Sequence, residues 1–208
     1  MKQVQDHFFH KAKSEGYRSR AAYKLLEIQE KRRLLRPGMR VLDVGAAPGS
    51  WTQVAGRIVG ARGTVVGVDL KAIDPQGMPP QVRLMEADLR DLDLQTFGGQ
   101  PFDVVLSDMA PDTSGDPGGD SLRSIALCHA LLDRLGAWLR AGGSLAMKVY
   151  EGGEYPTLLK RTTAEFDECK GFKPKASRAE SVEIFLVAKG FRGTPSAPLL
   201  PTAPRRGW

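Results

Sequence analysis

The hydrophobic positions of this chain form short apolar runs that alternate with longer segments of helical spacing. β-branched and aliphatic residues fill the runs, a composition typical of strands that are buried on both faces of a sheet. The runs predict strands at residues 40–44, 64–68, 82–85, 102–107, 144–149 and 183–188. Apolar residues at helical spacing predict helices at residues 19–31, 51–58, 121–140 and 155–166.

This alternation of strands and helices predicts an α/β fold with a doubly wound, mostly parallel sheet. Asp120 or Ser121 is expected to cap the helix of residues 121–140, and Gly142-Gly143 to end it. The basic helix of residues 19–31 is expected to lie against an edge of the sheet. Residues 1–192 are expected to form a single domain that includes this helix. The Pro-rich segment 193–208 is expected to be a disordered or extended tail.

The composition limits the class of protein. With 208 residues, 41% hydrophobic and 26% charged, the chain fits one globular domain with a sizeable core. It contains no apolar run of the roughly 18–20 residues that a bilayer span needs, and its N-terminus lacks the apolar core of a signal peptide. We therefore expect a cytoplasmic location. Neither Cys128 nor Cys169 has a partner at metal-ligand spacing, so no metal site is expected.

The formal net charge of +6 suits a polyanionic partner, and the excess is concentrated near the N-terminus. Tyr17 and Tyr23 interleave with basic residues there, and aromatic faces can stack on bases while basic side chains hold phosphates. The alternative is an ordinary solvated helix face. The residues expected to contact RNA are Arg18, Arg20, Lys31, Arg32 and Arg33.

A Gly-rich turn, residues 43–51, follows the first predicted strand. Gly45 and Gly49 allow the backbone to approach a ligand closely, and the loop and helix N-terminus are expected to offer free N–H groups. Pro48 interrupts the dinucleotide pattern G-x-G-x-x-G, and no G-K-[ST] follows, so neither NAD nor a P-loop is favoured.

Two carboxylates follow the next two strands. Asp69 is expected to accept hydrogen bonds from ribose hydroxyls, and Asp88 from an exocyclic adenine amine. The alternative for either residue is an ordinary turn or capping aspartate. Their position at the ends of successive strands, where ligands bind, favours a nucleotide-like cofactor.

Four charged residues, Lys24, Asp108, Lys148 and Glu183, stand at the ends of predicted elements that face one site. A neutral lysine could deprotonate a hydroxyl, although keeping an ordinary lysine neutral at pH 7 costs roughly 4.6 kcal/mol. Lys148 is the preferred base, with Asp108 to orient it. Lys24 is expected either to depress the pKa of Lys148 or to stabilise the alkoxide. Glu183, with Glu180 as the alternative, is expected to position Lys24 or the ribose.

Taken together, these motifs resemble the FtsJ/RrmJ family of S-adenosylmethionine-dependent RNA 2′-O-methyltransferases. The resemblance spans roughly residues 6 to 190, and its matching segments are residues 16–25, 43–51, 107–111, 147–149 and 173–179. It implies a Rossmann-like class I methyltransferase fold, with a seven-stranded sheet and helices on both faces. It also implies that Lys24, Asp108, Lys148 and Glu183 form the family's catalytic tetrad. The cofactor ligands that it implies are Gly49, Trp51, Asp69, Asp88 and Asp108.

Three positions depart from the family pattern: Asp112, Val182 and the segment 149–153. They flank the expected RNA surface and bear on the exact substrate. The bacterial members that the sequence resembles imply methylation of a uridine in the A loop of 23S ribosomal RNA, in the assembled 50S subunit. A basic chain that must dock on RNA is expected to be a monomer. The alternatives are a methyltransferase for transfer or messenger RNA, a non-catalytic RNA-binding ribosome-assembly factor, and an NAD(P)-dependent oxidoreductase.

Overall fold

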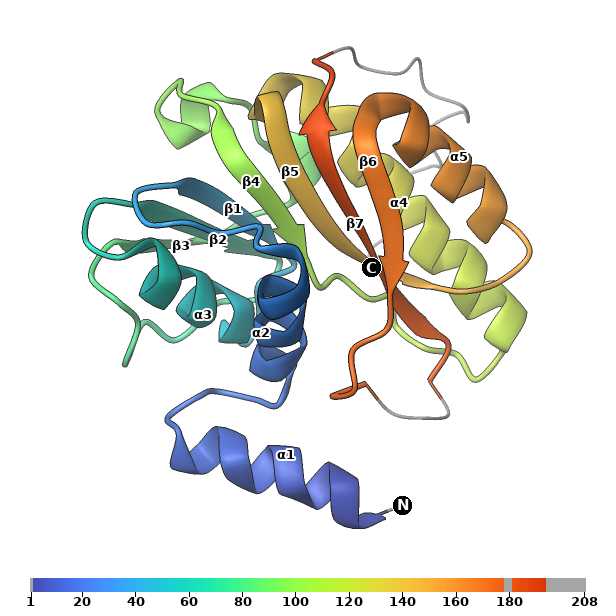
Figure 1. The fold of residues 1–208 in the computed structure, drawn as a ribbon, viewed down its shortest axis with the longest axis horizontal. Coiled ribbons are helices and arrows are strands. Elements are labelled where there is room, and N and C mark those ends of the chain that lie inside the picture. Colours follow the sequence, from blue (N-terminus) through green and yellow to red (C-terminus); the bar gives the residue numbers. More distant parts are fainter. Residues whose placement is uncertain (1, 178–180, 194–208) are drawn as a thin grey trace.

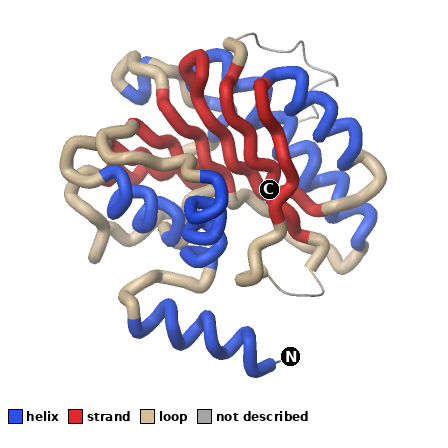
Figure 2. The backbone as a smooth tube through the Cα atoms, in the orientation of Figure 1, coloured by secondary structure: helices blue, strands red, loops and turns tan. Residues whose placement is uncertain are grey.

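The computed structural model describes residues 2–177 and 181–193, which build a seven-stranded sheet with helices on both faces (Figures 1 and 2). The strand order is β3-β2-β1-β4-β5-β7-β6. Neighbouring strands from β3 to β5 pair in parallel, whereas β7 runs antiparallel to both β5 and β6. The predicted doubly wound, mostly parallel α/β sheet is confirmed. The Pro-rich tail lies, apart from Gly193, outside the described residues.

The strands are β1 (Arg40–Val44), β2 (Thr64–Asp69), β3 (Val82–Glu86), β4 (Phe102–Ser107), β5 (Leu139–Tyr150), β6 (Phe166–Phe172) and β7 (Glu183–Phe191). The helices are α1 (Lys2–Ser14), α2 (Ala21–Arg32), α3 (Ser50–Val59), α4 (Pro117–Trp138) and α5 (Tyr155–Glu165). The short 3-10 helices η1 (Leu89–Asp91) and η2 (Gln95–Phe97) lie between β3 and β4.

Two hydrophobic cores, one on each face, hold the sheet between its helices. Alternate residues of a strand point to opposite faces, so Val41 joins the core under α2 and α3, and Leu42 joins the core under α4 and α5. Leu25 of α2 and Leu131 of α4 are both fully buried in these cores. This two-sided burial explains why the central strands are almost continuously apolar.

The N-terminal region contains two helices where the sequence predicted one. α2 covers a face of the sheet, because Ala22, Leu25 and Ile28 are buried against it, so the prediction of an edge position was wrong. α1 extends away from the body of the molecule (Figure 1). Its Phe8 ring lies 5.4 Å from the ring of Tyr23 in α2, the Lys11 Nζ lies 5.0 Å from the centroid of the same ring, and Ala12 is buried beside Tyr23; these contacts join α1 to the rest of the fold.

α4 begins four residues earlier than predicted. Asp116 caps it by accepting hydrogen bonds from the N–H groups of Gly118 and Gly119, with Pro117 in the first turn. Asp120, which was predicted as the cap, lies inside the helix and accepts from the Ser114 N–H. The helix ends at Trp138, before Gly142-Gly143, which lie within the long strand β5.

β6 was not predicted, because its sequence Phe-Asp-Glu-Cys-Lys-Gly-Phe has no continuous apolar run. Its pairing with β7 places it at the outer edge of the sheet, where polar residues are tolerated. In the described part of the chain, no helix is long and apolar enough to cross a membrane.

Candidate active site

A cavity of about 400 Å³ opens at the carboxyl ends of the central parallel strands, where β1 and β4 lie side by side and their connections leave toward opposite faces. Ligands bind at this switch point in doubly wound sheets, and the volume is that of a small-molecule site. Its lining includes Gly45, Asp69, Asp88, Asp108, Asp112 and Lys148.

The loop between β1 and α3 forms one wall of the cavity. Gly45 has φ 72°, and a Cβ there would come within 2.4 Å of the Met109 Cγ, so this position requires glycine. The N–H groups of Gly45 and Ala46 both donate to the Val68 carbonyl, and that of Gly49 donates to the Ala46 carbonyl. The prediction that this loop offers free N–H groups was therefore wrong, because the loop uses them to hold its own shape.

Asp69 and Asp88 both line the cavity, as expected from their strand ends. The Asp69 carboxylate accepts from the N–H of Ala47 at 2.9 Å and from that of Lys71 at 2.9 Å, which fixes it at the cavity wall. Asp88 caps η1 and pairs with Arg90 at 2.5 Å. Hydrogen bonds from Arg90 hold the pKa of Asp88 below its usual value. Asp88 thus combines the capping role with a place in the cavity wall.

Gly49 and Trp51 are not among the residues that line the cavity. Gly49 begins α3 with φ 101°, and its Cα faces Met78 and Ile73 of the β2–β3 connection. Trp51 is 2% exposed, stacks near Phe185 with ring centroids 5.4 Å apart, and donates its indole N–H to the Ala21 carbonyl. Both residues therefore pack behind the lining residues and contact neighbouring elements of the fold.

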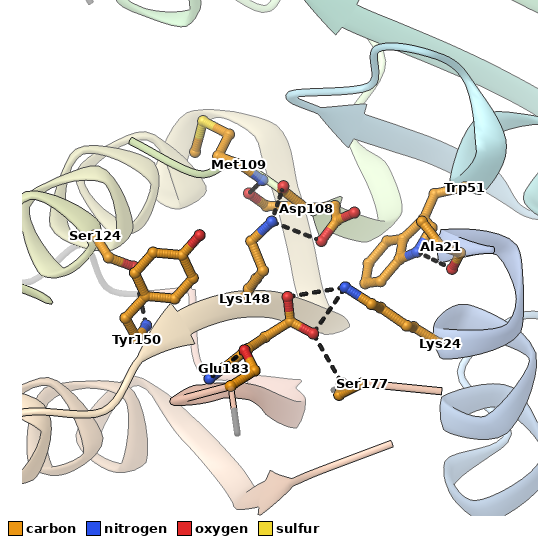
Figure 3. A network of polar contacts seen from close by, with 12 residues as sticks. Ala21, Lys24, Trp51, Asp108, Met109, Ser124, Lys148, Tyr150, Ser177 and Glu183 are labelled. Atoms are coloured by element: carbon orange, nitrogen blue, oxygen red, sulfur yellow. Dashed lines mark hydrogen bonds and ion pairs between the residues drawn. The ribbon is translucent and has the colours of Figure 1, made fainter. Parts of the chain in front are cut away.

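Lys148, at the end of β5, faces Asp108 directly after β4 (Figure 3). Its Nζ donates to the Asp108 main-chain carbonyl at 2.6 Å and lies 3.0 Å from Asp108 Oδ1. The hydrogen bond points at the carbonyl, so the contact with the carboxylate is an ion pair. Lys148 is only 8% exposed and lines the cavity.

Lys24 of α2 forms a second buried ion pair, with Glu183 at the start of β7 (Figure 3). Lys24 Nζ lies 2.7 Å from Oε1 and 2.8 Å from Oε2 of Glu183. Ser177 donates its hydroxyl to the same carboxylate at 2.8 Å. The structure thus brings the four predicted residues together as two ion pairs, Lys148–Asp108 and Lys24–Glu183. Glu180 lies outside the described residues.

The charges of these pairs set the ionisation of the site. Burial lowers the pKa of Lys148, but Asp108, through its charge and hydrogen bond, and Glu183 outweigh burial, and the net pKa is raised. Burial raises the pKa of Glu183, but Lys24 outweighs it and the net pKa is lowered. Of the two roles expected for Lys24, the contacts favour stabilisation of the alkoxide over depression of the Lys148 pKa, because Lys24 is paired with Glu183 and Glu183 raises the pKa of Lys148. The raised pKa favours the ammonium form of Lys148 at neutral pH.

Sequence reasoning gave no role to two residues beside the tetrad. Ser177 lies in the segment 173–179, which matched the family, and its bond to Glu183 depends on a loop that only the fold places there. Tyr150 follows Lys148 by two residues on β5, so it lies on the same face of the strand (Figure 3).

Of the departures from the family pattern, Asp112 lines the cavity, and Val182, next to Glu183, is 47% exposed.

The predicted RNA-binding residues divide into two groups. Arg18 and Arg20 precede α2, on the side of Lys24. Lys31, Arg32 and Arg33 lie at the far end of that helix, about 12 Å from Lys24 along the helix axis. Arg32 pairs with Glu168 at 2.8 Å, and Lys31 and Arg33 are exposed. No group of three residues able to hold a metal ion occurs among the described residues.

The strand order, the switch-point cavity and the acidic strand ends define a Rossmann-like methyltransferase fold. A family model described as FtsJ-like methyltransferase matches residues 17–191. The chain belongs to this family of methyltransferases.

Named relatives and solved structures agree with this assignment. The chain is 47% identical to "Ribosomal RNA large subunit methyltransferase E" of Syntrophobacter fumaroxidans, over 91% of this chain and 97% of the relative. It is 45% identical to the Acinetobacter baylyi protein of the same name, over 90% and 88%. The fold matches a ribosomal RNA methyltransferase structure from Plasmodium falciparum with a TM-score of 0.75 and 29% identity, over 86% of this chain and 100% of that chain. Fibrillarin of Aeropyrum pernix, at 15% identity and a TM-score of 0.57, shares the fold; 81% of this chain and 73% of that chain are covered.

Proposed function

We propose that this protein transfers a methyl group from S-adenosylmethionine to the ribose 2′-hydroxyl of a uridine in large-subunit ribosomal RNA. The observation that carries the proposal is the placement of Lys148, held by Asp108, in the wall of the cavity. The relatives named for the large subunit support this substrate. The A loop of the assembled subunit is the proposed location.

The residues of the cavity fit the cofactor. Asp69 offers carboxylate oxygens to a ribose diol, and Leu70, Ala87 and Leu89 provide an apolar lining for an adenine ring. The Asp108 carboxylate places a negative charge in the cavity wall, where it would attract the cationic sulfonium of the cofactor. When bound, S-adenosylmethionine supplies a methyl group on a cationic sulfonium, which is already a good leaving group.

Lys148 then acts as the general base. It takes the proton of the 2′-hydroxyl onto its neutral Nζ; the ribose oxygen forms the new bond to the methyl carbon, and the carbon–sulfur bond breaks. The products are the methylated ribose, S-adenosylhomocysteine and a Lys148 ammonium. Because Asp108 and Glu183 raise the pKa of Lys148, the base must lose a proton before each turnover. A cation bound beside Asp108 lowers this pKa.

Lys24, Glu183 and Ser177 hold the other side of the reacting ribose. The Lys24 ammonium is positioned by two contacts with Glu183, and this buried cation stabilises negative charge that develops on the ribose oxygen. Ser177 fixes the Glu183 carboxylate in turn. The tetrad therefore divides into two pairs. Lys148 is the general base and Asp108 holds it, whereas Lys24 and Glu183 position the ribose and stabilise its oxygen.

The substrate is tested by offering one methyl donor to several RNAs. Purified large ribosomal subunits, deproteinised ribosomal RNA and total transfer RNA are incubated with the protein and labelled S-adenosylmethionine, and the product is mapped by nuclease digestion. Label at one alkali-resistant uridine of the large-subunit RNA supports the proposal. Label confined to transfer RNA would overturn the substrate, and cofactor binding with no transfer to any RNA would indicate a non-catalytic RNA-binding protein.

A further inference from the structure

Arg18, in the connection between α1 and α2, directs its guanidinium toward the main chain of two neighbouring loops. Nη1 donates to the Pro48 carbonyl at 2.9 Å, and Nη2 donates to the carbonyls of Asp74 and Gln76 at 2.5 Å each. Three of the five N–H donors of the side chain are thus used by main-chain oxygens. A phosphate ligand would require donors that are free to face solvent.

The three carbonyls belong to two of the loops that contribute residues to the cavity wall. Pro48 lies in the loop between β1 and α3, and Asp74 and Gln76 lie in the connection between β2 and β3. This connection begins with Leu70 and Lys71, both of which line the cavity. Arg18 therefore joins two loops that are separated by about 26 residues of chain.

Asp69 joins the same two loops from the cavity side, through the N–H groups of Ala47 and Lys71. Arg18 joins them through Pro48, Asp74 and Gln76, which are not among the residues that line the cavity. Between these links the loops are in close contact, because a Cβ on Gly49 would lie 2.3 Å from the Met78 Cε and 3.3 Å from the Arg18 Nη1. The cavity wall is thus fixed at two points, one acidic and one basic.

The segment that carries Arg18 is itself anchored on α3. Gln53 donates to the Gly16 carbonyl at 2.9 Å, Arg57 donates to the same carbonyl at 3.3 Å, and the hydroxyls of Ser19 and Ser50 lie 2.7 Å apart. The backbone on both sides of Arg18 is therefore held against the start of α3, which directs the guanidinium toward the loops.

We propose that Arg18 is a positioning residue that clamps the two cofactor loops together, and that it is not a phosphate ligand of the RNA. The clamp maintains the distance between the Gly-rich loop and the wall formed by Leu70 and Lys71. The identity of the ligand, S-adenosylmethionine, rests on the proposed function. The clamp itself rests only on the contacts of Arg18.

The test compares Arg18→Gln and Arg18→Lys with a matched control, Arg20→Gln. Arg20 lies two residues away, and within the described part of the chain its side chain makes no hydrogen bond or ion pair. Binding of S-adenosylhomocysteine is measured by calorimetry, and binding of deproteinised large-subunit ribosomal RNA is measured over a range of salt concentrations. Arg18→Lys is decisive, because lysine keeps the charge that a phosphate needs and loses the fork that reaches three carbonyls.

Both Arg18 variants should raise the Kd for S-adenosylhomocysteine by about tenfold or more, since charge-assisted hydrogen bonds are lost. Their RNA affinity and its salt slope should stay within error of the wild type. Arg20→Gln should do the opposite, with a salt slope reduced by about one and an unchanged Kd for S-adenosylhomocysteine.

Two results would overturn the clamp: an S-adenosylhomocysteine Kd within twofold of the wild type in Arg18→Lys, or a salt slope reduced by about one in Arg18→Gln. A rise in the KM for S-adenosylmethionine with little change in kcat distinguishes loop positioning from a general loss of structure. A wild-type protein that binds S-adenosylhomocysteine and methylates no RNA would refute the proposed function and leave the clamp test intact.

Discussion

Replacing Glu183 by Gln tests whether the Lys24–Glu183 pair is a tightly coupled buried pair. The two side chains are 11% and 9% exposed, and Lys24 Nζ lies 2.7 Å from Oε1. At an effective dielectric constant of about 20, the gross attraction over this distance is about 6 kcal/mol. Desolvation cancels much of it, but removing one partner leaves the other charge buried and costs about 3–5 kcal/mol.

Gln keeps one hydrogen-bond acceptor for Lys24, so we expect the lower end of this range, about 3 kcal/mol. With an m-value of about 2 kcal/mol per M, the urea midpoint should fall by about 1.5 M at pH 7. The matched control is Glu168→Gln, which breaks the Arg32–Glu168 pair. That pair has a similar distance of 2.8 Å, but the Glu168 side chain is 40% exposed. The control should leave the midpoint nearly unchanged.

The effect of Glu183→Gln should also depend on pH with a definite sign. The net pKa of Glu183 is lowered in the folded protein, so its contribution is fully present above the unfolded value of about 4.3 and is lost as the pH falls through the folded pKa. The difference between wild type and variant should therefore shrink below about pH 4. Equal midpoint shifts for Glu183→Gln and Glu168→Gln, or a difference that does not change with pH, would refute the reasoning.

Three further predictions concern the base, the cofactor wall and the core. Because the net pKa of Lys148 is raised, kcat/KM should rise with a slope near one in log units from pH 6.5 to about 9, and a plateau below pH 8 would contradict Lys148 as the base. Asp69→Ala should raise the Kd for S-adenosylmethionine by about tenfold or more in calorimetry, since Asp69 fixes both cofactor loops; an unchanged Kd would remove it from the site. Burial raises the pKa of Asp43 to about 7, so wild-type stability should fall by up to about 4 kcal/mol as pH rises from about 4 to 7. In urea unfolding, Asp43→Asn should abolish that fall in stability. If the stabilities of the two proteins changed in parallel with pH, Asp43 would be excluded as its cause.

The sheet could be predicted because its central strands are buried on both faces, which leaves apolar runs such as Phe102–Ser107 in the sequence. The same reasoning missed β6, whose pairing with β7 compensates for its polar residues. The predicted start of α4 at residue 121 was four residues late, because Gly118 and Gly119 are poor helix formers and the Asp116 cap stabilises them in the first turn.

The members of the tetrad could be predicted, but their pairing could not. Lys24 and Glu183 are 159 positions apart in the chain, so their contact depends on α2 and β7 meeting over the sheet. The pattern of basic residues likewise predicted a charged segment near the N-terminus. It could not separate Arg18, whose partners are carbonyl oxygens of distant loops, from the exposed Arg33. Main-chain acceptors leave no signal in the sequence.

The most direct test of the account is methyl transfer by Lys148→Arg, with cofactor binding measured on the same protein. Arginine keeps the positive charge beside Asp108 and cannot lose its proton at neutral pH. The wild type should form alkali-resistant 2′-O-methyluridine in large ribosomal subunits. The variant should form none under single-turnover conditions, while its Kd for S-adenosylhomocysteine stays within a few-fold of the wild type. Methyl transfer by Lys148→Arg at a rate near that of the wild type would contradict the central claim that Lys148 is the base.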